Sequence, residues 1–214
     1  MNLNIYNKLK QIWPCSDKTL FDTFGVHVDQ DGLEIDSLTY EINETIMHKF
    51  FSEIWQPRLK KFKFSGLKLI DEINALNPRS VLDVGCGYNE FKGKINNLLG
   101  IDPYNKNADV KVKIEDYQTQ DKFDVIISLG STHFGPQQKI EEQMSKMYNL
   151  LEPQGKIFFR VNPGINDEYE MTKWINFFPW NVFFITEMAK KYNFSVLDLR
   201  HDAFDRIYFV YGKL

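Results

Sequence analysis

Two short segments combine glycines and acidic residues in a spacing that suits ligand binding. The first is DVGCG at residues 83–87, which overlaps and follows the apolar run 80–84. Its glycines let the backbone pass close to a ligand, and the N–H groups of the following turn can face a negative group. The second is Asp102, which ends the next apolar run, 98–102. A carboxylate there can accept both hydroxyl groups of a ribose, so the pair indicates a nucleoside-bearing cofactor.

The same loop distinguishes between nucleoside cofactors. A dinucleotide fingerprint places a third glycine at position 90, where this chain has Glu90. An acid is also unfavourable beside a pyrophosphate. Asp83, two residues before the first glycine, suits a cofactor with an ammonium group. S-adenosylmethionine carries such an ammonium group together with a carboxylate, a ribose and an adenine.

His133 is the candidate for acid–base chemistry. It lies just past the apolar run 123–130, at the position where ligands bind in parallel sheets. A histidine there can serve as the general base for an acceptor hydroxyl, and the alternative is a surface or capping histidine. Cys86 fits packing better than a nucleophilic role, because no activating base adjoins it in sequence. The other three histidines show no metal-ligand spacing, so we propose no metal site.

These residues follow short apolar runs that the sequence predicts as strands of one sheet. The runs alternate with amphipathic segments, which is typical of a parallel sheet with helices on both faces. The predicted strands are 80–84, 98–102, 109–114, 123–130, 156–161, 194–200 and 206–212, with helices over 139–151 and about 185–192. The last two strands are too close for a crossover and should pair as an antiparallel hairpin. We therefore expect an α/β fold with a seven-stranded, mostly parallel sheet.

Residues 1–69 have a different, irregular pattern and are predicted to form a helical N-terminal extension. A helix from about Glu44 to Trp55 is indicated by apolar residues at helical spacing, with Pro57 as its stop. We divide the chain into this extension and a core over 70–214. Because the core holds the cofactor motifs, we expect the extension to lie across the carboxyl ends of the strands as a lid on the acceptor side.

Four segments together resemble a known family. VLDVGCG, GIDP, FDVIISLGSTHFG and LLEPQGKIFFRV, followed by the terminal strand pair, are similar in order and spacing to class I S-adenosylmethionine-dependent methyltransferases, with their Rossmann-like sheet. The resemblance runs from about residue 70 to 214. SLGSTH is similar to the segment after the fourth strand in the small-molecule branch that includes quinone-biosynthesis methyltransferases, where a histidine often takes the place of His133. The resemblance implies methyl transfer to an oxygen, nitrogen or carbon nucleophile, with S-adenosylhomocysteine as product.

The resemblance also implies roles for individual residues. Asp83 orients the methionine amine, Gly85 and Gly87 line the methionine portion, and Asp102 holds the ribose hydroxyls. Glu115 or Asp116 lies near the adenine amino group, and residues 129–131 flank the sulfonium. The implied cofactor-binding residues are Asp83, Gly85, Cys86, Gly87, Tyr88, Asp102, Pro103, Ile114, Glu115, Asp116, Leu129, Gly130 and Ser131.

The chain departs from the family in two places. Asn89 stands where the third glycine of the loop is usual, and asparagine can also adopt a positive φ. The segment from Asn89 to Leu99 is short and contains Gly93, so we expect a stunted first helix.

Composition and charge limit the partners. The 214 residues are 43% hydrophobic and carry a net charge of −3, which argues against a disordered tail or a chain coated with positive charge for nucleic acid. The segment after the fourth predicted strand also lacks the Asn/Asp-Pro-Pro-aromatic pattern of amino-methylating nucleic-acid enzymes. We expect a small-molecule acceptor and not DNA, with RNA or protein as alternatives. Two cysteines, no membrane-span run and no leader pattern indicate a cytoplasmic protein.

Other readings stay open at this point. A non-catalytic S-adenosylmethionine-binding module would fit the Asn89 departure, and a nucleotide-sugar or dinucleotide enzyme could use a related sheet. The basic run 58–68, with interleaved Phe62 and Phe64, could meet RNA or be a solvated helix face. The aromatic residues could wall an apolar substrate pocket or pack a late helix on the sheet; they are Trp174, Phe177, Phe178, Trp180, Phe183 and Phe184.

Overall fold

The computed structural model describes residues 47–48, 51–52, 66–164, 177–202 and 205–214. They form a six-stranded sheet in the order β2-β1-β3-β4-β6-β5. The strands are β1 (Val81–Val84), β2 (Leu98–Ile101), β3 (Phe123–Leu129), β4 (Leu151–Val161), β5 (Phe194–His201) and β6 (Ile207–Lys213). The helices are α4 (Leu67–Asn74), α5 (Gln137–Leu150) and α6 (Val182–Lys191), with a 3-10 turn, η3 (Ile114–Asp116).

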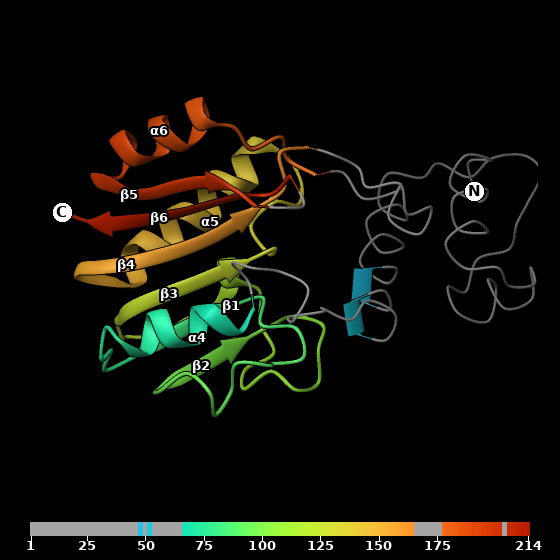
Figure 1. The fold of residues 1–214 in the computed structure, drawn as a ribbon. Helices are drawn as coiled ribbons and strands as arrows, with labels where there is room; N and C mark the ends of the chain where they lie inside the picture. Colours follow the sequence, from blue (N-terminus) through green and yellow to red (C-terminus); the bar gives the residue numbers. More distant parts are fainter. Residues whose placement is uncertain (1–46, 49–50, 53–65, 165–176, 203–204) are drawn as a thin grey trace, which may run out of the picture.

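The strand directions gather the ends of four strands at one edge. β2, β1, β3 and β4 run parallel, so their carboxyl ends meet on the right-hand side of Figure 1. β6 runs antiparallel between β4 and β5, so the prediction of an antiparallel terminal pair is confirmed. The pattern leaves the loops after β1, β2, β3 and β4 side by side, which is where parallel α/β sheets bind ligands.

The sheet has six strands in the described residues, and the predicted strand over 109–114 is wrong. Only Val110 pairs there, in a single parallel bridge with Ile101. The carboxylate of Asp109 accepts the backbone N–H of Gly100 at 2.8 Å. The Asp109 side chain thus engages a backbone N–H of β2 that a longer strand ladder would use. The segment leaves the sheet after the single bridge at Val110.

The predicted helix over 44–55 lies mostly outside the described residues. The structure describes only 47–48 and 51–52 of it, and these lie in helical turns. The predicted stunted helix after β1 is confirmed, since residues 88–97 form turns around two bridge positions. Gly93 and Asn97 have φ of +75° and +57°, outside the helical region, and end any regular helix there.

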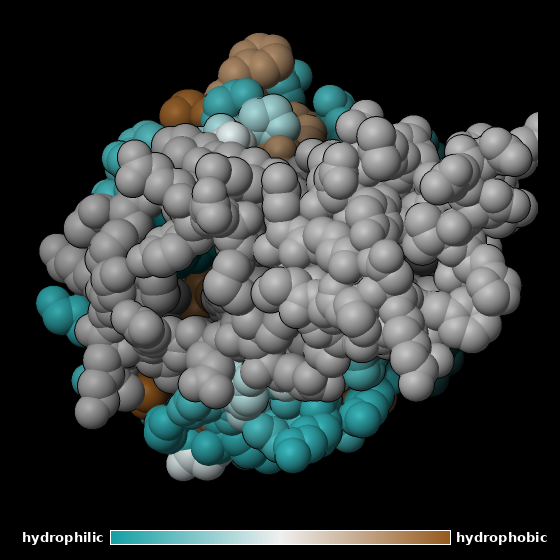
Figure 2. Space-filling model, turned by 90° about the vertical axis from the view of Figure 1, so that its right-hand side faces the viewer, coloured by the Kyte–Doolittle hydropathy of each residue, from teal (hydrophilic) through white to brown (hydrophobic). Residues whose placement is uncertain are grey.

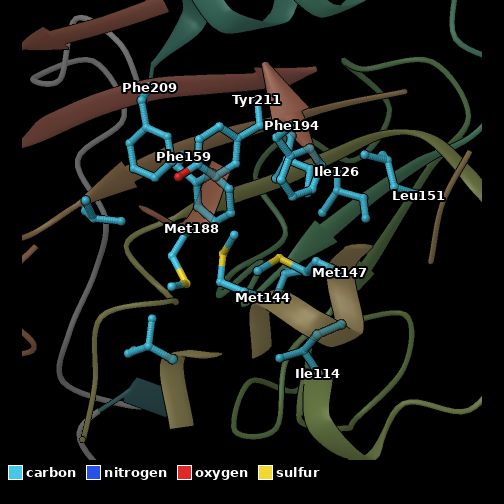
Figure 3. Close-up of a cluster of buried hydrophobic side chains, with 14 of the residues drawn as sticks. Ile114, Ile126, Met144, Met147, Leu151, Phe159, Met188, Phe194, Phe209 and Tyr211 are labelled. Carbon is cyan, nitrogen blue, oxygen red and sulfur yellow. The ribbon is translucent and has the colours of Figure 1, made fainter. Parts of the chain in front are cut away.

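The core packs as two layers on the two faces of the sheet. On one face, Met144 and Met147 of α5 and Met188 of α6 lie against Phe159 and Phe209, among other buried side chains (Figure 3). On the other face, Leu69 and Ile73 of α4 pack with Val81, Val125 and Ile127. Successive residues of β3 alternate between these two clusters, as the period of a strand requires. None of the described helices has the length and apolar character needed to cross a membrane.

Candidate functional site

The loop after β1 is held against the end of β2 and against the loop after β3. The backbone N–H groups of Gly85 and Cys86 both donate to the carbonyl of Ile101, at 2.8 and 3.0 Å. Gly85 has φ +70°, and a Cβ there would lie 2.3 Å from Cβ of Ser131. Gly87 has φ +53°, but a Cβ there would meet no heavy atom of the described residues within 4 Å. Gly85 is therefore required by close packing, whereas Gly87 borders open space that a ligand could occupy.

Asp102 joins the loops after β1 and β2. Its Oδ1 accepts the N–H groups of Tyr104 and Asn105, each at 2.8 Å, and its Oδ2 accepts the N–H of Gly87 at 3.0 Å. Asp102 is 7% exposed; both lone pairs of its Oδ1 are engaged, and Oδ2 has one lone pair left. The structure thus brings Asp102 and the glycine loop together, with capacity for a further hydrogen bond at Oδ2.

Asp83 is the second buried acid at this edge. It lies opposite Gly100 of β2 and is 4% exposed. Burial, and then the charge of Asp102, raises the pKa of Asp83 to about 7. A cation that reached Asp83 would favour its ionised form, so this position suits an ammonium group. Burial also raises the pKa of the Cys86 thiol, assisted by the three neighbouring carboxylates, which fits packing and not nucleophilic chemistry.

The loop after β3 is fixed by hydroxyl groups. Ser131 Oγ donates to the carbonyl of Val84, at the end of β1. Ser128 Oγ lies 2.9 Å from Ser131 Oγ and 2.6 Å from Thr132 Oγ1. Gly130 has φ +87° and donates its N–H to the carbonyl of Arg160 at 2.8 Å. The residues predicted to flank a sulfonium, 129–131, therefore sit next to the loop after β1.

The residues predicted near the adenine lie on η3. Glu115 accepts a hydrogen bond from Gln143 of α5 at 2.8 Å, and Ile114 is buried in the core. Asp116 is exposed. A hollow of about 360 Å³ lies beside this turn; it is lined by Lys113, Glu115, Asp116, Pro136, Gln138, Lys139 and Glu142. The two acids thus share one hollow, with Glu115 already tied to α5.

His133, the predicted general base, is buried, and its ring is held in the neutral form. Its side chain is 7% exposed, and Nδ1 accepts the backbone N–H of Asn162 at 3.2 Å. Burial, and then the charges of Arg206 and Arg160, lowers the pKa of His133 to about 3. With the lone pair of Nδ1 engaged, the neutral ring carries its proton on Nε2 and has no lone pair to accept another.

The aromatic residues predicted near the substrate divide into two groups. Phe178, Trp180 and Phe184 pack on one another in the core, with centroid distances of 4.7 to 5.7 Å. The indole Nε1 of Trp180 donates to the carbonyl of Thr132 at 2.8 Å. Packing therefore explains these three, while Phe183 is exposed and Trp174 lies outside the described residues. Phe177 differs, because its ring lies 5.1 Å from that of His133.

A second aromatic group at this edge was missed by the sequence analysis. Phe51 of the N-terminal extension stacks on Tyr104, with 6.0 Å between centroids, and meets Phe134 edge-on at 5.4 Å. Tyr88 donates a hydrogen bond to the carbonyl of Ser52 at 3.4 Å. Phe51 is one of the apolar positions of the predicted helix over 44–55, and nothing in the spacing of Tyr104 or Phe134 links them to it.

These contacts place the described part of the extension beside the loops after β1, β2 and β3 (Figure 1). Figure 2 is viewed from this side of the molecule; hydrophilic residues lie along its lower border, and hydrophobic residues lie among hydrophilic ones at the top, on the side of α6. Val182 and Phe183, 50% and 75% exposed, begin that helix. In the part of the chain that the structure describes, no group of three or more histidine, cysteine or acidic residues could hold a metal ion.

Comparisons with known proteins agree with this geometry. A family model described as a methyltransferase domain matches residues 47–199. The search of curated proteins found no match. Among solved structures, 1,6-didemethyltoxoflavin-N1-methyltransferase from Burkholderia thailandensis, with bound 1,6-didemethyltoxoflavin and S-adenosylhomocysteine, has a TM-score of 0.63 at 12% identity. The match covers 88% of this chain and 98% of that one.

Two further structures share the fold. The N-methyltransferase NodS from Bradyrhizobium japonicum, in complex with S-adenosylhomocysteine, has a TM-score of 0.50 at 13% identity, over 92% of this chain and 97% of that one. An O-methyltransferase family protein from Burkholderia thailandensis has a TM-score of 0.52 at 11% identity, over 96% of this chain and 69% of that one. With a family model that spans most of its length, the chain belongs to the methyltransferase domain family, in agreement with the class I methyltransferases that its sequence resembles.

Proposed function

We propose that the chain transfers the methyl group of S-adenosylmethionine to a small-molecule acceptor. The observation that carries the proposal is the pair of buried carboxylates, Asp83 and Asp102, on either side of a glycine loop with open space at Gly87. An ammonium and a ribose on one ligand would match these two acids. These two acceptor groups therefore fit the cofactor.

In this proposal each loop holds one part of the cofactor. Asp83 faces the methionine amine, Gly85 to Tyr88 line the methionine portion, and Asp102 with Pro103 holds the ribose. Ile114, Glu115 and Asp116 border the adenine, and residues 129–131 lie near the sulfonium. The cofactor supplies an activated methyl group. The chain has to align the acceptor in line with that methyl group and exclude water.

The acceptor is proposed to be a small molecule. The net charge of −3 disfavours nucleic acid, and one structural neighbour is a methyltransferase with 1,6-didemethyltoxoflavin bound. Neighbours described as N- and O-methyltransferases share the fold, so the fold alone does not fix the acceptor atom. From the segment SLGSTH we further propose that the chain belongs to a branch similar to the quinone-biosynthesis methyltransferases. Cysteine usage supports a cytoplasmic location.

We also propose that residues 1–69 act as a lid over the core, 70–214. The support is that Phe51 and Ser52 contact Tyr104, Phe134 and Tyr88, from the loops after three strands. A segment held across these loops can exclude water and shape the acceptor side. Because all the proposed cofactor-binding residues belong to the core, loss of the extension should affect binding of the acceptor more than binding of the cofactor.

A non-catalytic module is disfavoured by Asn89. The support for a non-catalytic module is that asparagine replaces a glycine in the proposed cofactor loop. Asn89 has φ +56°, however, and so adopts the conformation that a glycine would provide. Its Nδ2 also donates to the carbonyl of Asn107 at 3.0 Å, which ties the loop to the segment after β2. The departure in sequence therefore preserves the geometry.

A thermal-shift comparison tests the cofactor. The melting temperature should rise with S-adenosylhomocysteine and stay unchanged with NAD, because a ligand that binds only the folded state stabilises it by mass action. Stabilisation by NAD alone would favour a dinucleotide enzyme on a related sheet. No shift with S-adenosylhomocysteine, together with no heat of binding by calorimetry, would contradict the proposal.

A further inference from the structure

His133 is a mostly buried residue with a side-chain donor that the described residues do not use. Its Nδ1 accepts the N–H of Asn162, so the ring proton lies on Nε2. Within the described residues, no group accepts a hydrogen bond from Nε2, although the side chain is only 7% exposed. Nε2 is not among the fully buried unpaired atoms of the described residues, so this N–H can be reached from outside, and a donor held in place by a mostly buried ring at this edge suits a ligand.

The imidazole ring lies beside the place where β3 ends. A Cβ on Gly130 would lie 3.7 Å from Cε1 of His133, the ring carbon between Nδ1 and Nε2. The rings of Phe134 and Phe177 meet the imidazole almost at right angles, at 4.3 and 5.1 Å. These two walls are apolar, so they shield the ring from water and offer no strong acceptor to Nε2–H.

We propose that Nε2–H of His133 donates a hydrogen bond to the methyl acceptor, which therefore carries a carbonyl oxygen, an oxyanion or a ring nitrogen close to the methylated atom. This inference rests on the proposed function and names the substrate class of that site. The lone pair of the acceptor nucleophile forms the new bond to the methyl carbon. The carbon–sulfur bond breaks, and its electron pair stays on sulfur.

His133 keeps its proton throughout this reaction. The acceptor arrives as an anion or with a free nitrogen lone pair, and an amine product releases its proton to solvent. The charged groups that face the imidazole are Arg160 of β4 and Arg206 before β6, and Arg160 is paired with Asp202. Both cations, together with burial, lower the pKa of His133 to about 3, so the ring stays neutral at physiological pH.

Long-range proton–nitrogen NMR of the full chain tests the tautomer without an acceptor. We expect Nδ1 unprotonated and Nε2 protonated from about pH 8 to about pH 5, a range that spans the ordinary histidine pKa of about 6.5. His133→Gln assigns the signal by its loss. Titration of this ring between about pH 6 and 7, or a proton on Nδ1, would overturn the role proposed for His133.

Variants test the hydrogen bond once methyl-label transfer has identified an acceptor. His133→Ala should lower kcat about 10²-fold, the usual effect of removing one hydrogen-bond donor from a reacting group. His133→Gln retains an N–H donor and should recover most of that loss. His201→Gln, at an exposed position of β5, is the matched control and should keep the wild-type rate. All three should bind S-adenosylhomocysteine like the wild type.

Two results would overturn the inference. His133→Ala at the wild-type rate would mean that the acceptor does not use this donor. His133→Gln as slow as His133→Ala, with a wild-type rate that falls below about pH 6.5, would mean that His133 works as a base. If His133→Ala does not fold, His133→Gln and the pH profile still decide. A wild-type chain that does not bind S-adenosylhomocysteine fails at the proposed function instead, whatever the NMR tautomer.

Discussion

Gly85 and Ser131 lie so close that a single added methyl group could not fit between them. A Cβ on Gly85 would be 2.3 Å from Cβ of Ser131, whose hydroxyl group donates to the carbonyl of Val84. The contact joins the loops after two adjacent strands, β1 and β3. The loop after β1 is therefore positioned by close packing on its neighbour as well as by its own glycines.

Alanine at Gly85 should mainly lower stability, whereas alanine at Gly87 should mainly weaken ligand binding. Gly85→Ala should lower the free energy of unfolding by about 2–5 kcal/mol, because a positive φ and overpacking act together. Gly87→Ala should cost about 1–2 kcal/mol, from its positive φ alone, but should weaken S-adenosylhomocysteine binding because its methyl group enters the open space. Urea denaturation and calorimetry measure the two quantities. Equal destabilisation by both changes would contradict the packing described here.

Asp102→Ala should weaken binding of S-adenosylhomocysteine by about 1–3 kcal/mol, since charge-assisted hydrogen bonds to the ribose would be lost. Asp121→Ala is the control, because that acid is exposed in the segment before β3. Calorimetry on both variants gives the comparison. Asp102 also accepts three backbone N–H groups, so a circular dichroism spectrum should confirm that the variant is folded. An unchanged affinity would place the ribose elsewhere.

Asp83 should make stability and binding depend on pH in opposite directions. Its folded-state pKa of about 7 is above the ordinary 3.8, so the folded chain holds a proton that the unfolded chain has lost. The contribution of Asp83 to stability is therefore present at low pH and is lost as pH rises towards 7. Asp83→Asn should remove this loss, which urea denaturation from about pH 5 to about pH 8 would measure.

Binding of an ammonium-bearing cofactor should ionise Asp83 and release its proton near neutral pH. The affinity of the wild-type chain for S-adenosylhomocysteine should therefore increase as pH rises through about 7. Calorimetry in two buffers with different ionisation enthalpies detects the released proton. Asp83→Asn with the same proton release as the wild type would show that another group titrates.

Phe51 should matter for the acceptor and not for the cofactor. Phe51→Ala removes the ring that stacks on Tyr104 and meets Phe134, which should loosen the extension. We expect kcat/KM for the acceptor to fall about 10-fold, since about 1.4 kcal/mol is a factor of ten and aromatic pairs contribute about 0.5–1.5 kcal/mol each. Phe183→Ala, at an exposed position of α6, is the control. A loss of S-adenosylhomocysteine affinity in Phe51→Ala would show that the extension also closes the cofactor side.

The sequence could predict the parts of the fold that depend on local pattern. The buried runs, the helix over 137–150 and the antiparallel terminal pair follow from period and connection length. The predicted strand over 109–114 was wrong, because the Asp109 carboxylate accepts the N–H of Gly100. Strand propensity does not include this competition between a side chain and the backbone for one donor. The contact between Gly85 and Ser131 likewise depends on tertiary structure.

His133 shows the same limit at the site. Its place after β3 could be predicted from the sequence, but its protonation depends on Asn162, 29 residues away, and on two arginines from other segments. The spacing of residues in the sequence contains no information on the burial of the His133 ring. The aromatic contacts of Phe51 also join segments far apart in the chain, so only a structure could bring them together.

Transfer of an isotopically labelled methyl group tests the central claim most directly. The full chain would be incubated with methyl-labelled S-adenosylmethionine and a small-molecule extract, with heat-inactivated chain as control, and the products separated by mass. We predict S-adenosylhomocysteine together with one labelled small molecule, both absent from the control. Label found only in RNA or protein would contradict a small-molecule acceptor, and no S-adenosylhomocysteine with any acceptor pool would contradict methyl transfer itself.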